Sequence, residues 1–379
     1  MKILLAGEYS RLHNSLKEGL QKLGHEAYVL SAGDDFKNYP SDYSIRPELT
    51  TRFPLSPLRK LIYRFTRHDI AVNEKIRKLD RIIPRLQNFD VVQLINSFPF
   101  ETTPRHEKNF LNRLFRQNHK AFLLACGDDP VVNDFYLRGK MRYSVLTPLS
   151  ENPFLKDQYG YSLKYLRPEY RQLHDFVLQN VKAVIPVDLD YALPYEGHPL
   201  NAGMIPNPVN IDKIPYIFTP PHDRVVIFHG INSGNIHKKG NIHFSNALKL
   251  IRKKYGNRVH IVETRDLPYR EYMQQLRQAH IVLDQVYSYD QGYNALESMA
   301  MGKVVFTGAE KEFREYYDLQ DEVCINALPD PEYLTERMSE LIENPAKLEH
   351  ISRNARHFIE QHHHYVKIAE RYIEVWQSR

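Results

Sequence analysis

Residues 283–297 have the types and spacing of a phosphate-binding helix start. An apolar run ends at Leu283, Gly292 permits a tight turn, and the pattern predicts a helix from Tyr293 or Asn294 onward. The free N–H groups at the start of a helix attract phosphate. Glu297, in the first turn, is placed to accept hydrogen bonds from vicinal hydroxyls of a sugar. The alternative is an ordinary helix cap, with the glutamate favoured by the helix dipole.

A second loop, residues 228–240, supplies positive charge. It follows another apolar run, contains three glycines and brings Lys238 and Lys239 to the start of a predicted helix. Backbone N–H groups of such a loop can wrap diphosphate oxygens, while Lys239 holds the group or stabilises its departure. The spacing matches neither GxxxxGK[ST] nor GxGxxG, which disfavours nucleotide hydrolysis and a nicotinamide role. The alternative is a plain surface loop.

The elements around these loops predict two α/β domains with doubly wound parallel sheets. Strands are expected at 2–6, 25–31, 91–95, 121–125 and 183–187, and again at 225–229, 259–263, 281–285 and 304–307. Helices are expected at 12–23, 241–254, 269–278 and 294–301, and the chain reads as helical from Pro331 to its end. Prolines concentrate in residues 205–222, where we place the linker between the domains.

Length and composition agree with two soluble domains. The chain has 379 residues, and no apolar run approaches the roughly 18–20 residues of a membrane span. Cys126 and Cys324 lie far apart, which indicates neither a disulfide framework nor a zinc site. No signal-peptide core is visible at the start, so we expect a cytoplasmic protein. His362, His363 and His364 are expected at the surface, because consecutive imidazoles cannot all ligate one ion.

The positive charge is concentrated in the first half. Residues 43–85 carry 11 basic and 4 acidic side chains, a net charge of +7, among many apolar ones. Such a surface can rest on anionic lipid headgroups, which predicts peripheral contact with the inner face of a membrane. The basic residues are Arg52, Arg59, Lys60, Arg64 and Arg67, and the apolar ones are Phe53, Leu55, Leu58, Leu61, Ile62, Tyr63 and Phe65. The alternative is a solvated helix face whose apolar side packs inward.

Two segments resemble the GT4 type of GT-B glycosyltransferases. One is the run Gly-x-x-x-Leu-Glu-x-Met-Ala-x-Gly-Lys-x-Val at residues 292–305, paired with the Lys-Gly that ends at Gly240. The other is Ile-Pro-Asn-Pro-Val-Asn at residues 205–210, which is similar to the stretch that enters the second domain in that family. The resemblance implies domains at 1–208 for the acceptor and 209–356 for a nucleotide-sugar donor. It also implies a final helix, 357–379, that crosses back to the first domain.

The resemblance also implies roles for particular residues. Lys239 matches the lysine that contacts the donor diphosphate, and Glu297 matches the second glutamate of a Glu-x7-Glu pattern, which holds the donor ribose. Gly7 matches the glycine loop of the first domain, and Glu263 is expected to face the nucleobase. The remaining residues assigned to the donor site are His229, Gly230, Asn232, Lys238, Gly292, Tyr293, Asn294, Ala295 and Leu296. The family needs no bound metal, so neither a metal nor another cofactor is expected.

The sequence departs from the family at three places. The first glutamate of the pair falls at Tyr289, beside Asp290, and the arginine usually found after the first strand of the second domain is absent. Where the family has a histidine near the acceptor, this chain has Asp128 and Asp129. With Glu8, they are assigned to the acceptor, and Asp128 is given a catalytic role. The alternatives are an Asp-capped turn and metal binding by adjacent aspartates.

These observations predict a retaining glycosyltransferase. It would move a sugar from a UDP- or GDP-linked donor to a hydroxyl of a glycan or lipid-linked saccharide, in surface polysaccharide synthesis, with Lys239, Glu297 and Asp128 as its catalytic residues. One alternative is a nucleotide-sugar 2-epimerase of the same fold, which needs groups for proton transfer at the sugar. Another is a non-catalytic basic protein that binds membranes or nucleic acid through residues 43–85; as a transferase, it is expected to bind no nucleic acid.

Overall fold

The apolar runs of the first half pair into one parallel sheet of six strands, in the order β3-β2-β1-β4-β5-β6. The computed structural model describes residues 1–34, 37–66 and 69–379. The strands are β1 (Lys2–Ala6), β2 (Glu26–Ser31), β3 (Tyr43–Ser44), β4 (Val91–Leu94), β5 (Lys120–Ala125) and β6 (Val184–Pro186). Ile3 lies opposite Ala27 on one side and Val91 on the other. The predicted strands are confirmed, and β3 is a two-residue edge strand outside the prediction.

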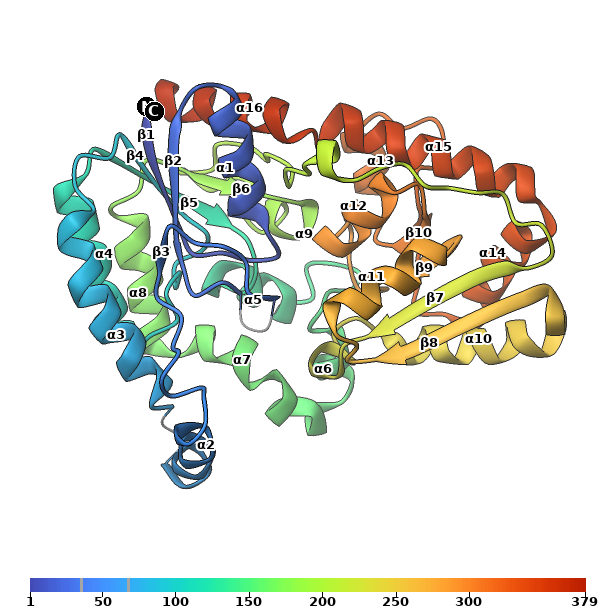
Figure 1. The fold of residues 1–379 in the computed structure, drawn as a ribbon, viewed down its shortest axis with the longest axis horizontal. Helices are drawn as coiled ribbons and strands as arrows, with labels where there is room; N and C mark the ends of the chain where they lie inside the picture. The colour runs from blue at the N-terminus through green and yellow to red at the C-terminus, as the bar shows by residue number, and fades with distance from the viewer. Residues whose placement is uncertain (35–36, 67–68) are drawn as a thin grey trace.

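Helices cover both faces of this sheet (Figure 1). The helices of the first half are α1 (Leu12–Lys22), α2 (Leu55–Thr66), α3 (Ala71–Ile82), α4 (Pro104–Gln117), α5 (Pro130–Leu137), α6 (Thr147–Glu151), α7 (Gly160–Leu163), α8 (Pro168–Leu178) and α9 (Leu189–Ala192). In α1, Leu12, Leu16 and Leu20 are buried, as their helical spacing predicts. The covering helices explain why the strands are apolar on both faces.

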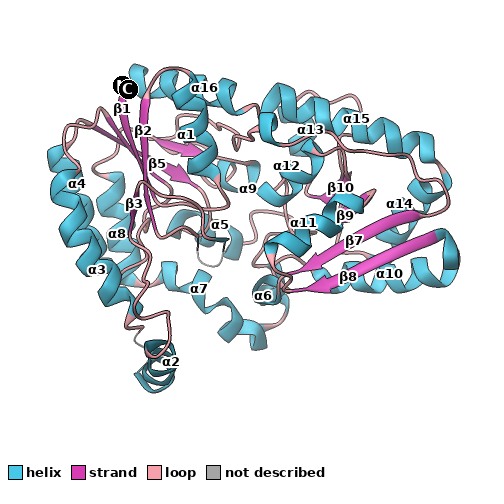
Figure 2. Ribbon diagram, viewed as in Figure 1, coloured by secondary structure: helices cyan, strands magenta, loops and turns pink. Residues whose placement is uncertain are grey.

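The second half forms a parallel sheet of five strands, in the order β11-β10-β9-β7-β8 (Figure 2). Its strands are β7 (Val225–Ile231), β8 (Val259–Arg265), β9 (Ile281–Leu283), β10 (Val304–Thr307) and β11 (Ile325–Asn326). Its helices are α10 (Asn241–Tyr255), α11 (Tyr269–Gln278), α12 (Tyr293–Ala300), α13 (Lys311–Tyr316) and α14 (Pro331–Glu343). The predicted α/β architecture with two doubly wound domains is therefore confirmed.

The end of the chain returns to the first domain. Helix α15 (Pro345–His362) runs along the second domain, and α16 (Tyr365–Ser378) packs against α1 of the first domain (Figure 1). The indole N–H of Trp376 donates to Gln93 Oε1 at 3.0 Å. At Gly19 the approach is so close that a Cβ would lie 2.3 Å from the carbonyl oxygen of Tyr365. The crossing helix is confirmed; the exact domain boundaries stay a prediction, and residue 357 lies inside α15.

The expectation that all three consecutive histidines lie at the surface is wrong for His363. Its side chain is buried between α15 and α16, and its Nδ1 lies 2.8 Å from the carbonyl oxygen of Asn207. Burial lowers the pKa of His363 to about 4, so the neutral ring donates to this carbonyl. His362 and His364 are partly exposed. The histidine at the centre of the run therefore fixes the turn through which the chain crosses between domains.

Aspartates join the two domains beside the ends of their strands. Asp190 of α9 accepts hydrogen bonds from the hydroxyl of Ser288 at 2.5 Å and from the backbone N–H of Tyr289 at 3.0 Å. In return, Asp290 accepts from the backbone N–H of Leu189 at 3.2 Å. Burial raises the pKa of Asp190 to about 6 and that of Asp290 to about 7. Burial thus makes the folded chain less stable when these carboxyls are ionised, although the hydrogen bonds that they accept favour the charged form.

Replacing Asp290 with Asn tests this joint. Between about pH 4 and about pH 7, Asp290 is protonated in the folded chain and ionised in the unfolded chain. The free energy of unfolding therefore falls as the pH rises through this range. Between about pH 6 and about pH 8.5, the wild type is expected to lose on the order of 1 kcal/mol more unfolding free energy than Asp290→Asn. Urea unfolding at the two pH values measures this difference. Asp157→Asn, at an exposed position, is the control; equal losses in wild type and Asp290→Asn would contradict the assignment.

Candidate functional site

A buried carboxylate joins the two segments that the sequence assigns to the diphosphate. Asp284, directly after β9, accepts from Lys239 Nζ at 2.7 Å and from Asn294 Nδ2 at 3.0 Å. Its second oxygen lies 3.4 Å from the hydroxyl of Thr307. The side chain of Asp284 is inaccessible to solvent, whereas Lys239 is 29% exposed. Lys239 is therefore held beside the N-terminus of α12, with part of its side chain exposed to solvent.

Close backbone packing keeps the loop of Lys239 in place. The carbonyl oxygen of Lys239 accepts from the N–H of Val286 at 3.1 Å. Gly240 follows with φ +63°, and a Cβ there would lie 2.1 Å from the Val286 side chain. Only glycine fits this backbone and this gap. The loop after β7 and the loop after β9 consequently form one unit.

Glu297 points into a pocket between the domains, with a volume of about 150 Å³. The pocket is lined by Arg11 and Ser15 of the first domain, by Asn210, Lys213, Ile214, Pro215 and Ile217 of the linker, and by Met273, Arg277, Glu297 and Met301 of the second. Burial raises the pKa of Glu297, and the positive charges of Arg11 and Lys37 oppose this. Among the described residues, no hydrogen-bond partner of its carboxylate is found, so both oxygens can accept hydroxyl groups of a ligand.

The other predicted residues of α12 have structural contacts. The hydroxyl of Tyr293 donates to Ser15 Oγ or to the carbonyl oxygen of Pro208 and so ties the helix start to the first domain. Ala295 and Leu296 are fully buried in the core. Gly292 is the N-cap, with extended backbone that leaves the first N–H groups of the helix unobstructed. Asn294 is also engaged: its Nδ2 donates to Asp284, and its Oδ1 accepts from the hydroxyl of Tyr272 at 2.6 Å. Within 292–297, the helix N-terminus and Glu297 are thus the groups placed to meet a ligand.

His229 and Glu263 form a pair underneath α10. His229 is fully buried; its Nε2 accepts from Asn241 Nδ2 at 2.9 Å, and its Nδ1 donates to Glu263 Oε2 at 3.0 Å. Glu263 also accepts from Ser245 at 2.8 Å, and the hydrogen bond from His229 is the main reason that its pKa is lowered to about 2. β8 continues to Arg265, so Glu263 lies inside the strand and not at its end. These contacts favour a structural role over the predicted contacts with the donor.

The remaining donor-site predictions are Gly230 near the end of β7, Asn232 directly after β7, and Gly7 directly after β1 in the first domain. Asn232 accepts from the N–H of Gly234 and so shapes the turn after β7. At Gly230 a Cβ would collide with Tyr272, 2.6 Å away. In the first domain, Gly7 has φ +89°, and a Cβ there would lie 2.1 Å from Ile95. The glycines are required for close packing where the chain passes the site.

Lys238 reaches the first domain instead of pairing with Lys239. Its Nζ donates to Ser162 Oγ at 2.7 Å and lies 3.8 Å from Asp128 Oδ2, which also accepts from Ser162 at 2.8 Å. Asp128 is thus brought next to the donor loop, as its assignment to the reaction requires. The ammonium of Lys238 therefore joins the second domain to Ser162 and Asp128 of the first.

Asp129 and Glu8 have their carboxylates engaged by the protein. Asp129 is the N-cap of α5: one oxygen accepts from the N–H of Val132, and the other accepts from the hydroxyl of Tyr195, each at 2.8 Å. This favours the capped turn that the sequence left open for Asp129. Glu8 is buried and accepts from Asn14 N–H at 2.9 Å, and burial raises the pKa of Glu8 to about 8. Glu8 is thus bonded to the first turn of α1.

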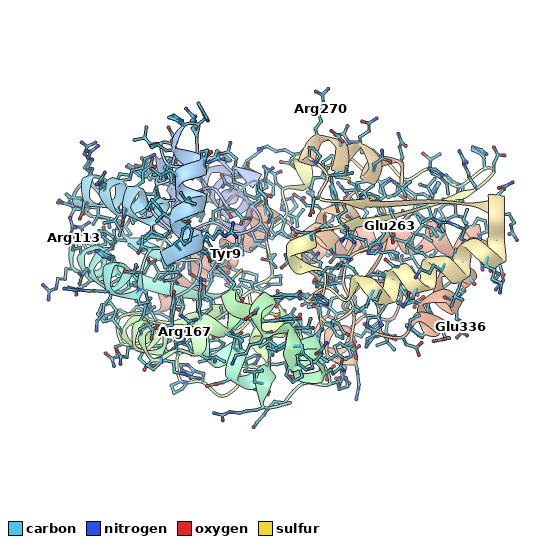
Figure 3. The ribbon with its side chains drawn as sticks, turned by 90° about the horizontal axis from the view of Figure 1, so that it is seen from below. Tyr9, Arg113, Arg167, Glu263, Arg270 and Glu336 are labelled. Carbon is cyan, nitrogen blue, oxygen red and sulfur yellow. The ribbon has the colours of Figure 1, made fainter. Side chains whose placement is uncertain are left out.

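A cluster of polar and aromatic side chains in the first domain was not predicted. Glu101 accepts from the hydroxyl of Tyr161 at 2.7 Å and lies 3.6 Å from Lys75 Nζ. The hydroxyl of Tyr9 lies 3.5 Å from Glu101, and Lys164 Nζ lies 3.6 Å from the centre of the Tyr161 ring. Tyr9 lies at the centre of the molecule, on the side of the first domain that meets the second (Figure 3).

Glu101 has the features of a ligand-binding group. Its φ of +52° is strained for a residue other than glycine, and its side chain is 29% exposed. Burial would raise its pKa, but Lys75, Tyr161 and Lys164 outweigh this and lower the pKa of Glu101. We refer to Tyr9, Glu101, Tyr161 and Lys164 as the first-domain cluster. These residues are distant in sequence, and only the position of Tyr9 just after the first strand was a signal for one of them.

Arg11 and Asp284 were also missed. The arginine that the GT4-type enzymes carry after the first strand of their second domain is absent here, yet the first domain places Arg11 at the start of α1, in the pocket of Glu297. Arg11 Nη2 donates to Glu18 at 3.0 Å. Arg11 and Asp284 could have been identified from their positions just after β1 and β9, because ligands of parallel sheets bind where strands end.

Comparison with known proteins agrees with this architecture. Residues 234–374 match a protein family described as glycosyl transferase-like. Among solved structures, sucrose-phosphate synthase from Thermosynechococcus elongatus superposes with a TM-score of 0.59 at 12% identity, over 100% of this chain and 99% of that one. A search of curated proteins gives no match.

Two further structures cover 100% of both chains. HepE of Anabaena, in complex with UDP and glucose, has a TM-score of 0.57 at 13% identity. A UDP-GlcNAc 2-epimerase from Neisseria meningitidis, bound to UDP-GlcNAc, has a TM-score of 0.50 at 13% identity. Such low identities show the fold alone. The chain has the GT-B fold, and residues 234–374 carry the sequence pattern of the glycosyl transferase-like family.

Proposed function

We propose that this protein is a retaining glycosyltransferase that takes a sugar from a nucleotide diphosphate and transfers it to a saccharide hydroxyl. The observation that carries the proposal is the buried carboxylate of Asp284, which holds Lys239 against the N-terminus of α12. An ammonium and free helix N–H groups are the two kinds of donor that bind a diphosphate. The family match of residues 234–374 supports the same activity.

The donor is proposed to lie with its diphosphate at Lys239 and its ribose at Glu297. Glu297 faces the interdomain pocket and has no partner among the described residues, as a carboxylate that binds sugar hydroxyls requires. We propose UDP as the nucleotide because HepE and the Neisseria epimerase, which share the fold, were solved with UDP or a UDP-sugar. GDP is the alternative.

In the proposed reaction, the bond between the anomeric carbon and the diphosphate oxygen breaks. The acceptor oxygen bonds to the same face of that carbon, and its proton leaves with the diphosphate. Lys239 and the N–H groups of α12 stabilise the negative charge on the leaving group. No metal is needed for this step, because an ammonium and oriented N–H groups supply the positive charge.

The acceptor is proposed to bind at the first-domain cluster and Asp128. Tyrosine rings and hydroxyls, with the carboxylate of Glu101, suit the apolar faces and the hydroxyls of a sugar ring. Asp128 lies beside the donor loop through Ser162 and Lys238 and is proposed to contact the reacting acceptor. The acceptor class is a glycan or lipid-linked saccharide of a surface polysaccharide.

The only support for the alternative of a nucleotide-sugar 2-epimerase is the shared fold. Removing and returning a proton at the sugar needs accessible acid–base groups. His13 and His229 are fully buried, and His229 is bonded through both ring nitrogens. His237, within the loop of residues 228–240, is partly exposed and is the histidine that such a reaction would use. Burial lowers the pKa of His13 to about 4. Incubation with UDP-GlcNAc alone, followed by sugar analysis, would reveal an epimerised product if this alternative holds.

Lys239→Ala and Glu297→Ala test the donor site. Each removes a charged hydrogen-bonding group, so the Kd for the UDP-sugar is expected to rise about tenfold or more. Isothermal titration calorimetry measures this, with Lys311→Ala and Glu336→Ala as matched controls at exposed positions of the second domain. Glu336 lies far from Tyr9 and the junction of the domains (Figure 3). Unchanged affinity in both site variants with intact folds would refute the donor assignment.

Glu101→Gln and Tyr161→Phe test the acceptor site. Both weaken hydrogen bonding to acceptor hydroxyls, so KM for the acceptor is expected to rise about tenfold for Glu101→Gln. The Kd for the UDP-sugar should not change, because neither side chain is among those that line the pocket of Glu297. Initial rates at varied acceptor concentration separate the two effects. A changed donor Kd with an unchanged acceptor KM would contradict this placement.

The configuration of the product tests retention. With a UDP-α-linked donor, same-face attack predicts an α-linked product. Proton NMR of the anomeric signal, followed during the reaction, reads the configuration directly. A β-linked primary product would show inversion and would require a general base opposite the leaving group.

A further inference from the structure

Helix α2 and the turn before it expose an unusual share of the apolar surface. In the described part of the chain, fourteen large apolar side chains are exposed, and seven of them lie within residues 49–65. The seven are Leu49, Phe53, Leu55, Leu58, Leu61, Tyr63 and Phe65. Phe53 is 87% exposed and Phe65 is 77% exposed. Contiguous exposed apolar surface on a soluble protein marks a site of contact with a partner.

Charge distinguishes the kind of partner. Residues 49–66 contain the basic residues Arg52, Arg59, Lys60 and Arg64 and no acidic residue. Arg52 and Arg64 are exposed beside the apolar side chains. A second copy of this chain, docked through the same face, would bring positive charge against positive charge. An anionic lipid surface offers both opposite charge and an apolar layer within reach of the phenylalanines.

The segment is fixed to the domain at both ends. The buried carboxylate of Glu74 on α3 accepts from the backbone N–H groups of Glu48, Leu49 and Thr50 at 2.7, 3.1 and 3.0 Å. Despite burial, these bonds lower the pKa of Glu74 to about 2, so the anchor stays ionised. Beyond the other end, Asp69 accepts two hydrogen bonds from Arg59 in the middle of α2, at 2.7 and 2.6 Å.

As a result, α2 projects from the first domain, away from both sheets (Figure 1). Asp69 precedes α3, and Lys75 of α3 lies 3.6 Å from Glu101 of the first-domain cluster. The projecting helix is therefore connected through α3 to the proposed acceptor site. The part of the predicted basic surface that includes Arg67 lies outside the described residues.

We propose that residues 49–66 dock this protein on an anionic membrane surface, with Phe53 and Phe65 among the lipid headgroups and Arg52 and Arg64 against lipid phosphates. The docking goes beyond the proposed transferase activity and does not depend on it. No described helix is long and apolar enough to span a bilayer. The contact is thus of the kind that lies on the membrane surface.

Vesicle co-sedimentation tests the proposal with the full chain. Binding is expected to vesicles of phosphatidylcholine mixed with phosphatidylglycerol, to be weak with phosphatidylcholine alone, and to fall with added salt. The double variant Arg52→Gln/Arg64→Gln should bind about 30-fold more weakly, and Phe53→Ser/Phe65→Ser should also lose binding. The controls are Phe154→Ser, 96% exposed outside the segment, and Arg270→Gln, exposed on the second domain.

Circular dichroism and UDP-sugar affinity keep the outcomes distinct. The proposal is supported if the site variants lose vesicle binding while their circular dichroism and their affinity for the UDP-sugar stay unchanged. If the wild type does not bind the UDP-sugar, only the proposed transferase activity is contradicted. Absence of vesicle binding in the wild type, or equal losses in the site and control variants, would overturn the docking proposal. A dimer in light scattering that Phe53→Ser/Phe65→Ser dissociates, or binding to DNA but not to vesicles, would also overturn it.

Discussion

The buried carboxylate of Asp284 is the constraint around which the second domain is organised. A charged group without access to solvent is costly unless it is paired and hydrogen-bonded. Lys239, Asn294 and Thr307 supply its partners, and they come from three different segments: the loop after β7, the start of α12 and the end of β10. Satisfying one carboxylate therefore brings an ammonium to a helix N-terminus. The arrangement that we propose to bind the diphosphate thus results from the pairing of this buried carboxylate.

The position of the first domain follows from contacts around the same site. The hydroxyl of Tyr293 meets Ser15, Lys238 meets Ser162 beside Asp128, and Asp190 binds the loop of Tyr289. Each contact starts from a residue at or next to a donor loop of the second domain. In the family pattern, the position of Tyr289 is a glutamate; here its backbone N–H is bound by the first domain. The two halves of the proposed reaction are thus held in one arrangement.

The sequence predicted the architecture because parallel strands are apolar on both faces. Runs such as residues 2–6 and 304–307 stand out from the polar helices between them. The two-residue strands β3 and β11 lie at sheet edges and leave no such pattern. Lys239 and Glu297 were identifiable from local spacing. The first-domain cluster was not, since Tyr9, Glu101 and Tyr161 meet only after folding. The burial of His229 and His363 was not identifiable either, because histidine occurs both inside proteins and at their surface.

A crystal structure of the protein with a bound UDP-sugar tests the central claim most directly. The account predicts that diphosphate oxygens lie within hydrogen-bonding distance of Lys239 Nζ and of the first N–H groups of α12, with the ribose hydroxyls at Glu297. Lys239 would then bridge the ligand and Asp284. A diphosphate bound elsewhere, with Lys239 still paired with Asp284 alone, would contradict it.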